Sequence, residues 1–158
     1  MPPSDPLNSL DTTDRRILRL LIEDGDLSSN ELAARVGLTA APLSRRLARL
    51  TESGVLRRTV IVDPKAVGLG LTVFLEVTLE RKAPQVGDRF LDRVTRMPEV
   101  LECHAVAGDF DFLLKISVRD VADYKRLLWT AFETIPEIKT LRSMVLLDTA
   151  KFQTSTVP

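Results

Sequence analysis

Hydrophobic residues in the first third of the chain recur at helical spacing, and residues that cap helices separate them. A first helix is predicted to begin at Asp11, with Asp14 at its third position. Ser28 and Glu31 have the spacing of a capping box, and a second helix follows them up to Gly37. The apolar stripe of the first helix consists of Ile17, Leu18, Leu21 and Ile22.

A third helix is predicted after the short turn at Gly37-Leu38, with Thr39 as its N-cap and Gly54 at its end. Its apolar stripe is Leu43, Leu47 and Leu50. Two capped helices joined by a short turn that contains glycine predict a helix–turn–helix. Residues 55–62 are expected to form a two-stranded hairpin or an extended arm.

The hydrophobic period changes in the second half of the chain. Alternation predicts strands at 69–80, 100–106, 110–118 and 138–147, and helical spacing predicts helices at 86–97 and 121–132. The order βαββαβ predicts a ferredoxin-like antiparallel sheet with its helices on one face. We therefore expect an α+β protein, with an N-terminal winged helix–turn–helix domain and a C-terminal ferredoxin-like domain. Trp129 and Met144 fall at positions typical of its core.

A segment with one proline and two glycines, residues 63–70, separates the two patterned regions and marks a domain boundary. The expected division is a flexible tail at 1–9, the helix–turn–helix domain at 10–62, a linker at 63–69, the ferredoxin-like domain at 70–152 and a second tail at 153–158. Because helices cover only one face of the predicted sheet, the other face, which carries Phe74, is expected to meet a second copy of the chain.

The net charge of the 158 residues is zero, but the charges are unevenly distributed. Residues 1–31 contain three arginines and seven acidic residues, whereas residues 32–62 contain six arginines and one acidic residue. A basic segment that uses only arginine is typical of phosphate binding. Taken alone, such a cluster is more often a solvated helix face.

Other patterns limit the class of protein. No apolar run approaches the length of about 18 residues that a membrane span needs, and the N-terminus lacks a secretory signal. With a single cysteine, Cys103, the chain is expected to be cytoplasmic. Cys103 and His104 are neighbours on a predicted strand and face opposite ways, so they do not form a nucleophile–base pair. We expect no enzyme, no metal site and no cofactor.

The third helix is the predicted contact with double-stranded DNA. Its small first residues allow a close approach to base edges, Arg45 reaches a guanine or a phosphate, and Arg46 and Arg49 are placed for phosphates. The alternative is a plain three-helix scaffold with a solvated arginine face. The predicted DNA-binding residues are Thr39, Ala40, Ala41, Pro42, Ser44, Arg45, Arg46, Arg49 and, in the segment that follows, Arg57 and Arg58.

A second candidate site is the tight connection between the second and third strands. Gly108 permits a close backbone approach, and Asp109 or Asp111 is a suitable acceptor for a ligand ammonium group. A turn requires the same residue types for itself, so spacing alone favours a purely structural role. The candidate residues are Val106, Ala107, Gly108, Asp109, Phe110 and Asp111.

Three segments carry a family resemblance. LDTTDRRILRLLIEDGDLSSNELAARVGLTAAPLSRRLARLTESGVL (10–56) resembles the winged helix–turn–helix of the leucine-responsive and asparagine-responsive (Lrp/AsnC) regulators. VDPKAVGLG (62–70) is similar to their linker, and ECHAVAGDFDFLLKISVRD (102–120) to the centre of their effector domain. The resemblance implies dimers built through the sheet domains, further assembly into tetramers or octamers, and an amino acid effector at the 106–111 loop. Ala48 and Thr51 depart from the charged residues common in the family, which leaves the operator sequence open.

The expected function is therefore a sequence-specific transcriptional regulator whose oligomer and DNA affinity respond to an amino acid. An architectural protein that compacts DNA without an effector is the alternative, and the sequence does not separate the two. A metabolite-binding module with an N-terminal domain used only for assembly is less consistent with the arginine-bearing helix.

Overall fold

The computed structural model describes residues 10–80, 84–153 and 155. They divide into two compact units. One unit runs to Val60 and includes the described residues from Lys151 onward, and the other is Ile61–Ala150. No helix in the described part of the chain is long and apolar enough to cross a membrane.

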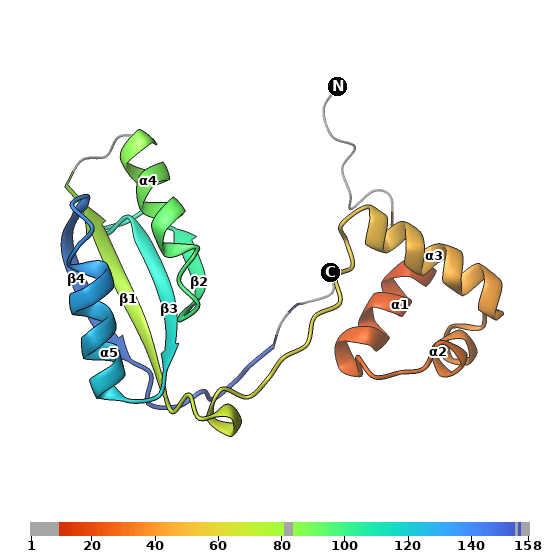
Figure 1. Ribbon diagram of the computed structural model, residues 1–158. Helices are drawn as coiled ribbons and strands as arrows, with labels where there is room; N and C mark the ends of the chain where they lie inside the picture. The colour runs from red at the N-terminus through yellow and green to blue at the C-terminus, as the bar shows by residue number, and fades with distance from the viewer. Residues whose placement is uncertain (1–9, 81–83, 154, 156–158) are drawn as a thin grey trace. The chain divides into compact units, whose positions relative to one another are not determined.

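The first unit contains three helices, α1 (Thr12–Glu23), α2 (Ser29–Val36) and α3 (Ala40–Glu52) (Figure 1). Each helix contributes to one small core. The buried core residues are Ile17, Leu18, Leu32, Ala33, Leu43 and Leu50. This arrangement confirms the predicted helix–turn–helix, and it leaves the opposite face of α3 exposed.

The predicted capping box at Ser28 forms, and Asp11 and Asp14 form a second capping box at the predicted start of α1. Asp14 donates its N–H to Asp11 Oδ1 at 2.8 Å, and Asp11 donates its N–H to Asp14 Oδ2 at 3.2 Å. Ser28 and Glu31 exchange the equivalent bonds at 3.0 and 3.3 Å. Gly37, with φ of 72°, ends α2 in the left-handed conformation that glycine adopts without strain. Local side-chain chemistry thus fixes where α1 and α2 begin.

Two local predictions need correction. Thr39 occupies the N-cap position of α3, but its side chain makes no capping hydrogen bond. Residues 55–62 form no strand, so the hairpin is wrong and the segment is an arm without regular structure. The reason is in the sequence VLRRTVIV, which lacks the glycine, asparagine or aspartate that a tight hairpin turn requires.

The second unit contains a sheet of β1 (Leu71–Leu79), β2 (Val100–Ala105), β3 (Phe112–Val118) and β4 (Ile138–Val145). The strand order is β2-β3-β1-β4, and every neighbouring pair is antiparallel. This confirms the predicted ferredoxin-like sheet. A short 3-10 turn at Lys65–Val67 precedes β1.

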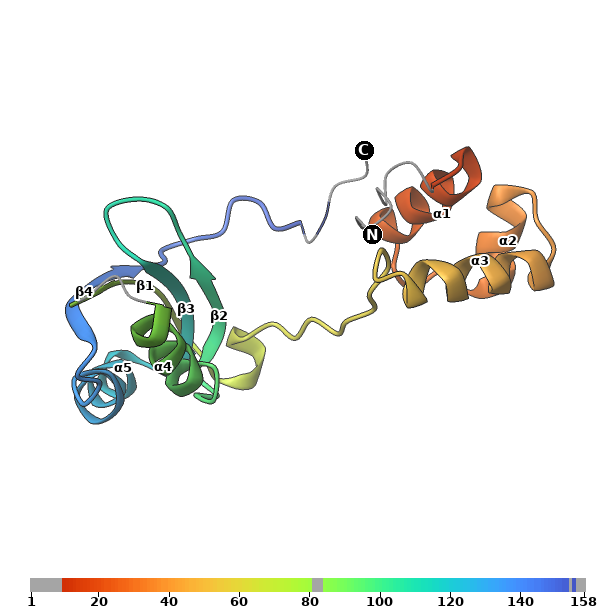
Figure 2. The same ribbon diagram turned by 90° about the horizontal axis from the view of Figure 1, so that it is seen from above.

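Two helices cover one face of this sheet (Figure 2). They are α4 (Pro84–Val94) and α5 (Val121–Leu127), which continues into a π-helical turn at Leu128–Phe132. The core between the layers includes the rings of Phe90 and Phe112, whose centroids are 4.9 Å apart. Alternate residues of β1 point into it and are almost fully buried: Val73, Leu75, Val77 and Leu79.

Trp129 and Met144 lie outside this core, contrary to the prediction. The Trp129 side chain is 56% exposed on the helical layer, and Lys125 Nζ lies 4.2 Å from its ring centroid, one helical turn away. Met144 is 39% exposed and is the register partner of Phe74, whose β1 position alternates with those that point into the core. Hydrophobic character alone did not reveal which faces the helices leave uncovered.

An ion cluster connects α1 to α3. Asp14 is fully buried, and its Oδ1 accepts a bond of 2.9 Å from Arg46. Arg46 also donates to Asp11 Oδ2 at 2.5 Å, and Arg49 donates to Asp14 Oδ2. Two hydrogen bonds hold the pKa of Asp11 below its ordinary value: the larger effect comes from the Asp14 backbone N–H and the next from the Arg46 side chain. The capping box of α1 therefore also binds the arginines of α3.

We predict that Asp14→Asn lowers the free energy of unfolding of the first unit by about 2 kcal/mol, because a buried carboxylate that pairs with two guanidinium groups is lost. Urea denaturation followed by circular dichroism measures this change. Asp26→Asn, in the exposed turn after α1, is the matched control and is expected to change stability by less than about 0.5 kcal/mol. Equal stability of the two variants would contradict the role assigned to Asp14.

Candidate nucleic-acid interface and ligand loop

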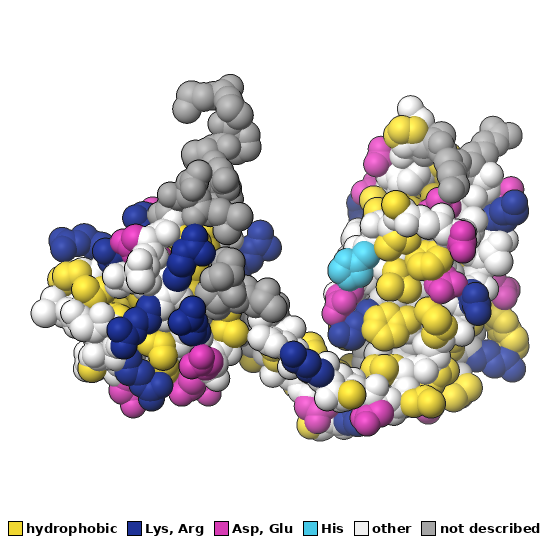
Figure 3. All heavy atoms as spheres, turned by 180° about the vertical axis from the view of Figure 1, so that it is seen from behind, with side chains coloured by type: hydrophobic (Ala, Val, Ile, Leu, Met, Phe, Trp, Pro, Cys, Tyr) yellow, Lys and Arg dark blue, Asp and Glu magenta, His cyan; other side chains and the backbone are white. Residues whose placement is uncertain are grey.

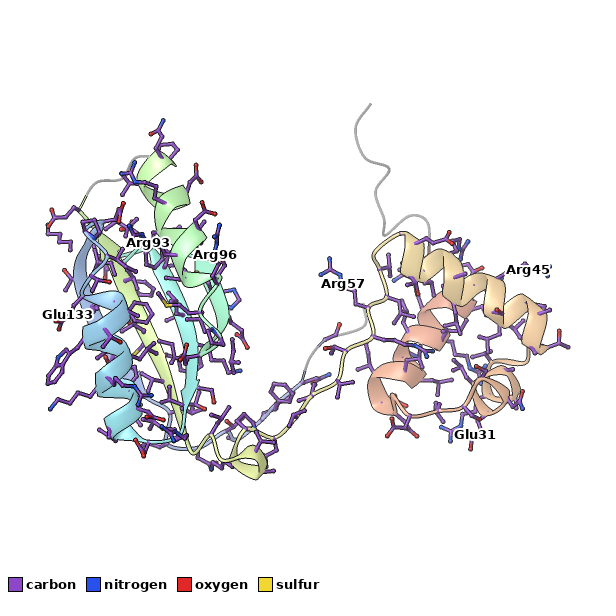
Figure 4. The ribbon with its side chains drawn as sticks, in the orientation of Figure 1. Glu31, Arg45, Arg57, Arg93, Arg96 and Glu133 are labelled. Carbon is purple, nitrogen blue, oxygen red and sulfur yellow. The ribbon has the colours of Figure 1, made fainter. Side chains whose placement is uncertain are left out.

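The outer face of α3 combines short side chains with the long side chains of Arg45 and Arg49, both of which are exposed. Ala41, Ser44, Arg45 and Ala48 are all exposed, opposite the buried Leu43 and Leu50. Figure 4 shows Arg45 extending away from the body of the helical unit. A helix with such a face approaches another surface closely, since few long side chains hold it away.

Arg46 and Arg49, both predicted to contact phosphates, are instead bound within the unit by Asp11 and Asp14. The Arg46 side chain is 29% exposed and that of Arg49 is 54% exposed, so Arg49 keeps more of its surface open to solvent. The sequence did contain a signal for this cluster. Asp14 lies four positions before Leu18, so the two residues share the helix face that is buried, where a carboxylate requires a cationic partner.

Two shallow hollows flank α3. The first, of about 330 Å³, is lined by Asp11, Pro42, Arg45, Arg46 and Arg49. The second, of about 380 Å³, lies on the other flank of α3 and is lined by small, hydroxyl-bearing and aliphatic side chains together with Glu52 and Arg58. The three arginines of α3 therefore lie on one flank of the helix, and its leucines lie on the other among polar side chains.

The remaining predicted DNA-binding residues lie near the two ends of α3. Thr39 and Ala40 are exposed at its start. Arg57 and Arg58 are exposed in the segment that follows it, and Figure 4 shows Arg57 there. The structure thus places the predicted residues on one helix and its two flanking segments.

The connection between β2 and β3 separates the two candidate carboxylates. Asp111 is part of the sheet structure, because its Oδ2 accepts the Leu79 N–H at 2.8 Å and its own N–H donates to Val77 O at 2.9 Å. Asp109 is exposed. A Cβ added to Gly108 meets nothing within 4 Å, so no close approach inside this chain requires a glycine there.

Val106 and Ala107 precede this turn, and Phe110 follows it. Val106 donates its N–H to the backbone oxygen of Asp111 at 3.0 Å and closes the loop. Phe110 is half-buried, whereas Ala107 is exposed. The loop is therefore fixed at its base, and its tip at Gly108-Asp109 is open to a ligand.

The sheet face without helices carries apolar and charged side chains side by side. Phe74 of β1 pairs in register with Met144 of β4 and with Lys115 of β3, and Leu113 of β3 pairs with Glu76 of β1. Lys115 donates to Glu102 at 2.8 Å, and Arg142 lies 3.8 Å from Glu76. Figure 3 shows hydrophobic side chains gathered on this face.

Cys103 and His104 lie on opposite faces of β2, as predicted. Cys103 packs against the core, where burial raises the pKa of its thiol, and exposed His104 has Nε2 3.2 Å from Glu102 Oε2. Within the described residues, no cluster of three or more histidine, cysteine or acidic side chains is arranged to hold a metal ion.

Comparisons with known proteins match both units. A family model described as the Lrp/AsnC ligand binding domain covers residues 72–156, and one described as winged helix–turn–helix DNA-binding covers residues 10–57. The leucine-responsive regulatory proteins of Klebsiella pneumoniae and Escherichia coli K12 are each 39% identical to this chain over 147 residues, which are 92% of this chain and 90% of theirs.

Solved structures agree with these relatives. A transcriptional regulator from Neisseria meningitidis in complex with L-Met has 34% identity and a TM-score of 0.86, covering 93% of this chain and 96% of that one. An AsnC family transcriptional regulator from Agrobacterium tumefaciens has 34% identity and a TM-score of 0.85, with the same coverage. Since family models match both units and close relatives span nearly the whole chain, this protein belongs to the Lrp/AsnC family of DNA-binding transcriptional regulators.

Proposed function

We propose that the chain regulates transcription by binding duplex DNA through α3 as a dimer or larger oligomer, and that an amino acid bound at residues 106–111 changes both assembly and DNA affinity. The observation that carries this proposal is the exposed face of α3, where small residues surround Arg45. This face has the size and charge that entry into a major groove requires.

The proposed DNA contacts divide by chemistry. The first turns of α3 approach base edges through Thr39, Ala40, Ala41, Pro42, Ser44 and Arg45. Arg57 and Arg58 contact the phosphate backbone from the segment after α3. Arg46 and Arg49 line the same hollow as Arg45 and keep donors for a phosphate, while Asp11 and Asp14 hold their guanidinium groups in place.

The proposed dimer uses the uncovered sheet face. Phe74, Leu113 and Met144 give this face apolar contact area, and Lys115 and Glu76, their register neighbours, add charged groups that a second copy of the chain can pair with. A two-fold dimer also presents two copies of α3 to paired half-sites on DNA.

The proposed effector is a small or apolar amino acid. The exposed carboxylate of Asp109 is suited to its ammonium group, and backbone N–H groups of the loop to its carboxylate. The L-Met complex of the Neisseria relative supports this class of ligand. The match to a ligand-binding domain disfavours the architectural alternative.

We keep the domain assignment proposed from the sequence, with tails at 1–9 and 153–158, the DNA-binding domain at 10–62, a linker at 63–69, and the effector and oligomerisation domain at 70–152. A regulator of this kind acts on the chromosome, so we place it in the cytoplasm. The function requires neither a catalytic group nor a cofactor.

Arg45→Ala is predicted to weaken binding to a selected operator by about 1–3 kcal/mol while leaving binding to random DNA nearly unchanged, because a base contact carries sequence information. Arg57→Ala is expected to weaken both equally and to reduce the salt dependence, since it removes a phosphate contact. Fluorescence anisotropy at several salt concentrations measures these effects. Unchanged affinity of Arg45→Ala at physiological salt would contradict the assignment of α3.

Phe74→Asp is predicted to dissociate the oligomer, because it places a charge in the apolar contact area of the proposed interface. Light scattering is expected to show the wild type above the chain mass of 17.6 kDa and the variant at that mass. Val121→Asp, at another exposed apolar position on α5, is the control and is expected to stay assembled. A monomeric wild type at micromolar concentration would refute the proposal.

Asp109→Ala is predicted to abolish the response of DNA affinity to an amino acid and to leave ligand-free DNA binding intact. Calorimetry of the wild type with each of the twenty amino acids identifies the ligand, and DNA titrations with and without it test the variant. Asp92→Ala, an exposed substitution on α4, is the control. If none of the twenty binds, the architectural alternative is favoured instead.

A further inference from the structure

One of the three arginines of α3 has no partner inside the described chain. Arg46 is bound by Asp11 and Asp14, and Arg49 by Asp14. Arg45 makes no hydrogen bond or ion pair with any residue that the structure describes. Because Asp11 and Asp14 bind Arg46 and Arg49, Arg45 is the arginine of α3 that remains available for a contact with a base.

The residues beside Arg45 are short. At about 100° per residue, Ala41 lies about 40° and Ala48 about 60° from Arg45 around the helix axis, one turn before it and one turn after it. Both alanines are exposed. Arg49 lies about 40° from Arg45 on the opposite side to Ala48, and Asp14 binds its guanidinium group. The methyl groups of Ala41 and Ala48 are the short side chains that α3 offers one turn before and one turn after Arg45.

Each base pair presents a distinct pattern in the major groove. Arginine makes a bidentate contact with guanine O6 and N7, and the methyl of alanine packs against the C5-methyl of thymine. Adenine is read in a bidentate manner by asparagine or glutamine, and neither residue occurs between Ala40 and Glu52. The side chains of α3 thus favour guanine and thymine.

The hollow on the leucine-bearing flank of α3 offers apolar surface beside Ala48. Its volume is about 380 Å³, and its lining combines aliphatic, hydroxyl-bearing and charged side chains: Ala40, Leu43, Leu47, Ala48 and Leu56 with Ser29, Ser44, Thr51, Glu52 and Arg58. The apolar part of this lining is suited to methyl groups. The three arginines of α3 line the hollow on the other flank, together with Asp11 and Pro42.

We propose that α3 reads a guanine flanked by thymines, with Arg45 bound to the guanine and the methyls of Ala41 and Ala48 packed against thymine C5-methyls. The inference rests on the proposed function, in which α3 enters the major groove. It adds the base preference, which the charge of the helix does not determine.

The test begins with duplexes selected from a random 20-base-pair pool by the full-length protein at physiological salt. Each thymine of a selected duplex is then replaced by deoxyuridine, which lacks only the C5-methyl, and each guanine by 7-deazaguanine, which lacks N7. One deoxyuridine next to the essential guanine is expected to weaken binding about fourfold, the effect of one buried methyl. The 7-deazaguanine is expected to weaken it about five- to tenfold.

Alanine-to-glycine variants assign the methyl contacts. Ala48→Gly is expected to reduce the ratio of the affinities for the thymine and deoxyuridine duplexes from about four to about one at a single position. Ala41→Gly is expected to do the same at a different position. Because both probes are measured on the same variant, any loss of helix stability cancels in the ratio. Ala122→Gly, at an exposed alanine of α5, is the control and is expected to keep the ratio at every position.

The outcomes separate this inference from the proposed function. If no duplex is enriched, the protein lacks sequence-specific binding, and the proposed function fails together with the inference. If duplexes are enriched but every deoxyuridine substitution is tolerated, or if the glycine variants keep the full ratio, only the inference is overturned.

Discussion

The orientation of α3 depends on the buried carboxylate of Asp14. A charge removed from water is tolerated only when opposite charges and hydrogen-bond donors surround it, and here Arg46 and Arg49 supply them. A rotation of α3 by one residue, about 100°, would separate both arginines from Asp14. The same bonds therefore determine which residues of α3 face outward.

This constraint links the start of one helix to the outer surface of another. Asp11 and Asp14 form the capping box of α1, and the same two carboxylates accept hydrogen bonds from α3. Arg46 donates to Asp11 Oδ2 and to Asp14 Oδ1, whereas Arg49 donates to Asp14 Oδ2, the oxygen that also accepts the Asp11 N–H. Thus the start of α1, which supplies none of the proposed DNA contacts, borders the arginines of α3 and holds two of them in place. A count of basic residues in this segment overstates the charge available to DNA, because two of the arginines are already partly neutralised.

Local structure and the order of the strands could be predicted from the sequence, whereas individual ion pairs between distant residues could not. The start of α1 at Asp11, the capping box at Ser28 and the alternation along β1 involve neighbours in the chain, so their spacing was sufficient. The partners of Arg46 lie 32 and 35 residues away, and a charge pattern does not say which acid meets which base. The predicted core positions of Trp129 and Met144 are wrong for a related reason. A hydrophobic residue indicates an apolar surface, but it does not say whether a helix or a sheet of the same chain covers that surface.

The hydrogen bond from Leu79 to Asp111 has a mechanical consequence. It clamps the base of the ligand loop to the end of β1, a central strand that also carries Phe74. A hydrogen-bonded strand in a close-packed sheet is stiff along its length, so a displacement at one end is transmitted rather than absorbed. A displacement at the base of residues 106–111 is therefore also a displacement of the end of β1, the strand that carries Phe74 on the uncovered face of the sheet.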